Sequence, residues 1–214
     1  MEPFIRSDQY NHIKAQAQIL VNGHSTANDR HVLDALKSLA AERATAVFEE
    51  LSPEQRDLIA PVSDVQDTMD IDAYLARLRP YTIPFRPLTE QSVKKLFPKA
   101  KKLKLPSFAQ ELELNEVSYI GWHDKGTGKY FMIAEAGEKW TGLSGTFSSS
   151  YQKGICTICS KFSETGLFTV ELKGSEQGTY VKKGNYICKD AKTCNENLTS
   201  VDKLHDFLDW MKTI

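Results

Sequence analysis

The chain has 214 residues, of which 41% are hydrophobic and 26% are charged, and its formal net charge is −1. This composition is ordinary for a globular protein, and the length suits one large domain or two small ones. The charge argues against a surface that binds polyanions everywhere. No apolar stretch approaches the roughly 18–20 residues of a membrane span, and residues 1–12 lack the apolar core of a signal peptide. We therefore expect a monomer that works in the cytoplasm and does not enter a membrane.

Residues 7–79 show apolar side chains at spacings of three and four, which predicts amphipathic helices. Four helices are expected, beginning at Ser7 or Asp8, Asn28 or Asp29, Ser52, and about Asp67, all residues that cap helices well. The second should bury Val32, Leu36 and Leu39, and the fourth Ile71, Tyr74, Leu75 and Leu78. Short connections between such helices are typical of an antiparallel bundle.

Three prolines, at positions 80, 84 and 87, interrupt the helical pattern. Proline removes amide donors and moves the preceding residue away from helix. We therefore predict a boundary here, with an N-terminal bundle of four helices in residues 1–80 and a C-terminal α/β domain in residues 81–214. Beyond the boundary, a short helix from Thr89 precedes strands predicted at 117–122, 130–134, 140–147, 167–172 and 179–187, and a last helix follows position 199. The fold class is therefore α+β.

All four cysteines lie in the last 59 residues and follow the pattern C-x2-C-x28-C-x5-C: Cys156, Cys159, Cys188 and Cys194. Two such pairs can surround one Zn2+ in a tetrahedron, and a site of four thiolates leaves no position for a substrate. A two-cysteine knuckle, a hairpin, and a cysteine pair running into a helix are the layout of a treble-clef zinc finger. We therefore expect one structural Zn2+, bound within about residues 150–214.

Other interpretations of the cysteines stay open at this point. Disulfides are rare in cytosolic proteins. A redox pair at Cys156 and Cys159 would need a long helix after it, whereas residues 161–166 have the composition of a turn. Another metal is a further alternative.

Residues 153–159, 180–190 and 194–195 closely resemble the FusB-type elongation factor G-binding proteins, a family that includes fusidic acid resistance proteins. The resemblance continues through 8–11, 83–85, the lysines before Pro106 and 118–122, and so covers essentially the whole chain. It implies that the zinc-finger domain binds elongation factor G and promotes its release from the ribosome, including when fusidic acid has trapped the factor there. It implies no covalent chemistry.

The residues that the resemblance assigns to the partner contact are Ile155, Lys183, Tyr186 and Phe207. Phe207 lies at the edge of the apolar stripe of the last helix, and Trp210 lies far from its centre. An aromatic side chain outside a core stripe is a candidate interface anchor. The alternative is that Phe207 widens the buried face.

A zinc-finger protein that binds RNA or the ribosome directly is the alternative function. Six lysines between positions 94 and 104, together with Lys182 and Lys183, could provide a secondary contact with ribosomal RNA. An enzyme with a structural zinc is a second alternative, but the sequence contains no recognisable pairing of nucleophile and base.

Overall fold

The computed structural model describes residues 1–100, 103–106, 109 and 113–214. The chain divides into two compact units, Met1–Ile83 and Pro84–Ile214. Among the described residues, none of the helices has the length and apolar character needed to cross a membrane.

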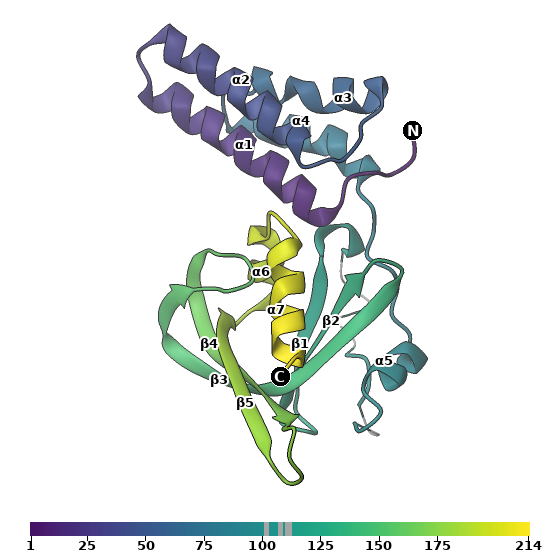
Figure 1. Cartoon of the computed structure of the whole chain (residues 1–214). Coiled ribbons are helices and arrows are strands. Elements are labelled where there is room, and N and C mark those ends of the chain that lie inside the picture. The colour runs from purple at the N-terminus through teal and green to yellow at the C-terminus, as the bar shows by residue number, and fades with distance from the viewer. Residues whose placement is uncertain (101–102, 107–108, 110–112) are drawn as a thin grey trace. The chain divides into compact units, whose positions relative to one another are not determined.

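The first unit consists of helices joined by short connections (Figure 1). They are α1 (Ser7–Thr26), α2 (Arg30–Ala46), α3 (Pro53–Ile59) and α4 (Thr68–Leu78), with 3-10 turns at Ala60–Asp64 and Arg79–Tyr81. Side chains cap three of the four where the sequence predicts: Asp29 accepts from the amide of His31, Ser52 from Gln55, and Asp67 from Asp70. The first helix begins earlier than predicted, because Arg6 is its N-cap residue and both Ser7 and Asp8 already lie within the helix.

The core of this unit is formed mainly by α1 and α4. Ile13, Ala17 and Leu20 are fully buried, and all four residues predicted for α4 are buried with them. The prediction for α2 is wrong, because Ala40 and Ala44 are its buried residues, whereas Val32 and Leu39 are exposed. The two alanines define a different stripe from the one that the larger apolar residues indicated.

The division between the units falls after Ile83, whereas the sequence pattern placed it after residue 80. Residues 81–83 associate with the N-terminal segment through backbone hydrogen bonds. The amides of Phe4 and Ile5 donate to the carbonyl of Tyr81 at 2.8 and 3.0 Å, and the amide of Ile83 donates to the carbonyl of Ile5 at 2.8 Å. These bonds attach the last residues before Pro84 to the helical unit.

The second unit is built on one antiparallel sheet in which strand order follows chain order. The strands are β1 (Tyr119–Asp124), β2 (Lys129–Ala136), β3 (Lys139–Ile155), β4 (Phe162–Lys173) and β5 (Tyr180–Cys188). The helices are α5 (Glu90–Leu96), α6 (Ala191–Asn197) and α7 (Asp202–Lys212), and Leu114–Glu116 form a 3-10 turn. The segment 161–166, expected as a turn, instead belongs largely to β4, which hydrogen-bonds to both β3 and β5.

Both faces of the β1–β2 hairpin are buried, which explains the unbroken apolar run at its centre. One face carries Ile120, Trp122, Phe131 and Ile133, which pack with Val93 and Phe97 of the α5 segment. The other face carries Tyr119, Tyr130 and Met132, which join the four cysteines and the buried side of α7 in a second cluster. The α7 helix lies across this second face of the curved sheet (Figure 1). The cysteine region is therefore part of the core of the whole unit.

Candidate functional site

The first cysteine pair lies on a tight knuckle between β3 and β4. The amide of Cys156 donates to the carbonyl of Lys161 at 3.0 Å, and the amide of Ser160 donates to the carbonyl of Cys156 at 2.8 Å. Ser160 has a φ of 59°, a left-handed conformation that non-glycine residues seldom adopt. The turn brings both thiols to one side of the loop.

The second pair comes from the end of β5 and from α6. Cys188 is the last residue of β5, and Cys194 lies in the middle of α6. Asp190 caps this helix, because its carboxylate accepts from the amide of Thr193 at 2.8 Å and from its hydroxyl at 2.7 Å. Partial burial disfavours the charged carboxylate, but the hydrogen bonds from Thr193 outweigh it and lower the pKa of Asp190. A stable first turn then holds Cys194 toward the knuckle.

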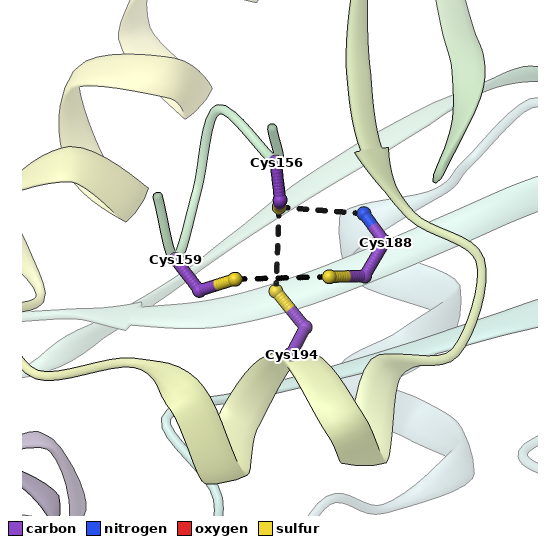
Figure 2. Close-up of side chains that lie close together, drawn as sticks. All are labelled: Cys156, Cys159, Cys188 and Cys194. Atoms are coloured by element: carbon purple, nitrogen blue, oxygen red, sulfur yellow. Dashed lines mark hydrogen bonds between the residues drawn. The ribbon is translucent and has the colours of Figure 1, made fainter. Parts of the chain in front are cut away.

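The four thiols converge on one point (Figure 2), and their sulfur atoms all lie within 4.8 Å of one another. The Sγ atoms of Cys156 and Cys194 are 3.8 Å apart, and those of Cys159 and Cys188 are 3.7 Å apart. Two sulfurs bound at about 2.3 Å to a tetrahedral Zn2+ are separated by about 3.8 Å. The separations are too long for disulfides, whose S–S bond is about 2.05 Å, and the cysteines are free. The four residues therefore fit a tetrahedral zinc ion.

Hydrogen bonds from neighbouring groups support the thiols. Ser163 Oγ lies 3.0 Å from Cys188 Sγ, and the amide of Cys188 donates to Cys156 Sγ at 3.3 Å. Hydrogen bonds from Cys159 and the other thiols lower the pKa of Cys156, whereas hydrogen bonding with Cys156 and its neighbours raises the pKa of Cys194. The four thiols therefore interact strongly with one another, and binding of zinc would displace protons from them.

A buried asparagine joins the metal-binding helix to the sheet. Asn195 follows Cys194 and is 3% exposed. Its Oδ1 accepts from the amides of Ser118 at 2.7 Å and Tyr119 at 3.2 Å, and its Nδ2 donates to the carbonyls of Tyr119 and Ala191, both at 2.9 Å. β1 is an edge strand. The carboxamide therefore pairs with both backbone groups of Tyr119 as a neighbouring strand would.

The residues predicted to contact a partner differ in their exposure. Ile155 and Tyr186 lie beside the knuckle and are 65% and 50% exposed. A hydrogen bond of 2.9 Å from the amide of Thr157 to the carbonyl of Tyr186 fixes their segments together. Lys183 lies on β5, and its ammonium contacts the end of α7. Phe207 is buried, at 3% exposure, with its ring 6.1 Å from that of Phe168.

The burial of Phe207 agrees with the alternative, in which this residue widens the buried face of α7, and its role as a partner anchor stays a prediction. The helix α7 is oriented so that its buried residues are Leu204, Phe207, Leu208 and Met211.

Two exposed aromatic residues near the metal centre were not among the predicted partner contacts. Phe162 is 69% exposed and pairs directly with Ile155 across β3 and β4. Trp210, which sequence reasoning found far from the core stripe of α7, is 45% exposed. The helical period did reveal Trp210, whereas Phe162 became recognisable only through the register of two strands.

The lysine run between 94 and 104 falls partly outside the described residues, because Lys101 and Lys102 are not described. Lys94, Lys95, Lys99 and Lys104 are exposed, and Lys94 forms an ion pair with Glu90 at 3.6 Å. Contact of this run with ribosomal RNA remains a prediction.

Two strands leading into a four-cysteine centre, with a ligand-bearing helix after the second strand, place the chain among treble-clef zinc-finger proteins. Family comparison agrees: residues 4–86 match the N-terminal domain of elongation factor G-binding protein, and residues 93–208 match the FBP C-terminal treble-clef zinc-finger. The chain belongs to the FusB-type family of elongation factor G-binding proteins.

Among solved structures, that of the fusidic acid resistance protein FusC is similar to this chain. The two superpose with a TM-score of 0.85 over 97% of each chain, at 28% sequence identity. Comparison with curated proteins gave no match.

Proposed function

We propose that the protein binds elongation factor G through the surface around its metal centre and promotes release of the factor from the ribosome. Such release would protect translation from fusidic acid. The proposal is supported by the two family matches, one in each unit, and by the similarity to FusC, which is described as a fusidic acid resistance protein. We place this action in the cytoplasm, where elongation factor G works.

The observation that carries the proposal is the exposure of Ile155 and Tyr186 on the two segments that the metal centre joins. Large apolar side chains at such exposure are candidates for interface anchors, and tyrosine is common among binding hot spots. A zinc ion bound by the knuckle and β5 would hold both side chains in fixed positions, so little conformational entropy would be lost on binding. Lys183, on the same strand, would add positive charge.

The chemistry of the site favours binding without catalysis. Four thiolates complete the coordination of a tetrahedral zinc ion, which leaves no position at which the metal could activate water or a substrate. The zinc would act by holding the surface together, and the protein would act by non-covalent contact with the factor.

A calorimetric titration of the zinc-loaded full chain with purified elongation factor G tests the proposal. Tyr186→Ala should weaken binding at least about tenfold, because truncation of an interface anchor commonly costs 2 kcal/mol or more. The matched control is Tyr180→Ala, at the far end of the same strand. In a sedimentation assay, the parent protein should move elongation factor G off ribosomes that have been stalled with fusidic acid. A parent protein with no affinity for the factor would refute the proposal.

A contact with ribosomal RNA is a second candidate, favoured by one surface of β5. Tyr180, Lys182 and Tyr186 lie at alternate positions of the strand and share a face, and all are exposed. Exposed aromatic and cationic side chains in this order can stack on unpaired bases and contact phosphates. A pull-down from bacterial lysate distinguishes the two candidates, because nuclease should abolish capture through RNA and leave capture of the factor intact.

A further inference from the structure

Trp210 is held in place by a contact that the sequence does not reveal. The Nζ atom of Lys183 donates a hydrogen bond to the carbonyl oxygen of Trp210 at 2.9 Å and lies 4.8 Å from the centre of its ring. Lys183 pairs in register with the buried Val170 of β4, so its side chain emerges on the face of the sheet that α7 covers. The carbonyl belongs to the last turn of α7, where carbonyls lack helical partners and cations are favourable.

A cation above an indole ring is attracted by the negative face of the ring, and more strongly where water is excluded. Lys183 thus restricts both the backbone and the ring of Trp210. A large aromatic side chain that is ordered before binding loses less entropy when a partner covers it.

A depression of about 390 Å³ lies next to the Trp210 ring, and its residues come from the knuckle, β5 and α7: Thr157, Asn185, Lys203, Asp206, Phe207 and Trp210. Thr157 Oγ1 donates to Asn185 Oδ1 at 2.7 Å, which ties the knuckle to the strand within this wall. The buried Phe207 contributes an apolar surface. The volume lies near the lower end of the range of about 300–1,000 Å³ for ligand pockets.

The charges around the depression indicate what would occupy it. Lys203 donates to the hydroxyl of Ser160 at 2.7 Å, and Lys183 donates to a carbonyl, so each ammonium bonds to a neutral oxygen. Asp206 is the carboxylate among the lining residues. Among the lining residues Lys203 and Asp206 balance each other, and the ammonium of Lys183, which lies 4.8 Å from the centre of the Trp210 ring, adds a positive charge beside the apolar surface. A complementary partner would present an apolar side chain next to a carboxylate.

We propose that Trp210 is the aromatic anchor of α7 for elongation factor G, that the depression beside it receives an apolar side chain of the factor flanked by an acidic group, and that Lys183 is a positioning residue for Trp210. This inference rests on the proposed function. It adds Trp210 to the predicted contacts, and it extends the surface of Ile155 and Tyr186 around the knuckle to α7.

Calorimetric titration of zinc-loaded full-length variants with purified elongation factor G tests the inference. Trp210→Ala should weaken binding at least about tenfold, whereas Tyr180→Ala, the loss of a more exposed aromatic residue of β5, should change it less than about twofold. Asp206→Asn, a mild change at an exposed position, should strengthen binding about twofold to threefold by removing the anion of the rim. Zinc content and circular dichroism should match the parent in each variant.

A double-mutant cycle tests the role of Lys183. Lys183→Met should weaken binding about threefold to tenfold in the parent but less than about twofold when Trp210 is already alanine, because only an ordered ring benefits from the lysine. Quenching of Trp210 fluorescence by acrylamide, measured as the difference from Trp210→Phe, should rise in Lys183→Met without any partner present.

The outcomes separate this inference from the proposed function. If the parent does not bind elongation factor G, both the proposed function and this inference are refuted. If the parent binds but folded Trp210→Ala binds equally well, or Asp206→Asn weakens binding, the anchor and its depression are refuted while the proposed function stands. An equal effect of Lys183→Met in both backgrounds would show that Lys183 contacts the factor directly and does not act through Trp210.

Discussion

Replacing Asn195 by alanine should destabilise the zinc-binding unit strongly, although this side chain is not expected to touch the metal. The change removes four hydrogen bonds of 2.7–3.2 Å. Two of them satisfy the amide and the carbonyl of Tyr119, a residue that is 1% exposed. A buried polar group without a partner costs about 1–3 kcal/mol, so two such groups, partly relieved by relaxation, should cost about 2–4 kcal/mol.

The assay is urea unfolding of the zinc-loaded protein, followed by circular dichroism and by release of zinc to a colorimetric chelator. Asn197→Ala is the matched control, because Asn197 is an asparagine of the same helix with one bond of 2.8 Å, to the carbonyl of Thr193. It should cost less than about 1 kcal/mol. Zinc should leave Asn195→Ala at a lower urea concentration than it leaves the control. If the two variants unfold within about 0.5 kcal/mol of each other, pairing of the carboxamide with β1 does not stabilise the unit.

The parent should contain one Zn2+ per chain by elemental analysis. Cys156→Ser should unfold residues 84–214 while helices α1–α4 persist in circular dichroism, because metal binding and folding are linked. A native near-ultraviolet signal without metal would contradict this. Ser160→Gly should raise the free energy of unfolding by about 0.5–1 kcal/mol, because glycine adopts the left-handed backbone without strain; Ser160→Ala, which also loses the hydroxyl bonded by Lys203 but keeps its Cβ, is the control. Burial lowers the pKa of His12 below 6.5. As the pH falls, the unfolded protein therefore binds a proton at His12 before the folded protein does. The first unit should therefore lose stability as pH falls from 6.5 through the pKa of folded His12, and thermal unfolding of His12→Gln should show a smaller loss; an unchanged pH dependence would refute this role.

Features of the fold that depend on neighbouring residues could be predicted from the sequence. Ser52 and Asp67 cap helices because their side chains reach amides only three residues away, so the sequence signature contains the whole interaction. The four cysteines were recognised in the same way, since their spacing and residue type already define a ligand set.

Features that depend on long-range packing could not be predicted. Whether Phe207 or Trp210 leaves the core depends on the angle at which α7 meets the sheet, and the helical period alone does not fix this angle. Exposure of Phe162 follows from its pairing with Ile155, across a knuckle whose geometry the sequence does not encode locally. The bonds of Asn195 join residues 76 positions apart, and no pattern near Cys194 indicates them.

The length of β3 restricts how this zinc finger can be divided or transferred. The strand has 17 residues and would span roughly 55 Å if it were straight. Its first half pairs with β2 over residues 139–145, and its second half pairs with β4 from residue 146 to the knuckle, with a register shift between Ser149 and Lys153. A genetic crossover or a proteolytic cut near residue 150 would divide the strand within the half that pairs with β4 and leave each fragment with an unpaired edge. The smallest segment that could be transferred with an intact metal centre is therefore the whole second unit, Pro84–Ile214. A graft of the cysteine region alone would carry the metal ligands without the sheet that orients them.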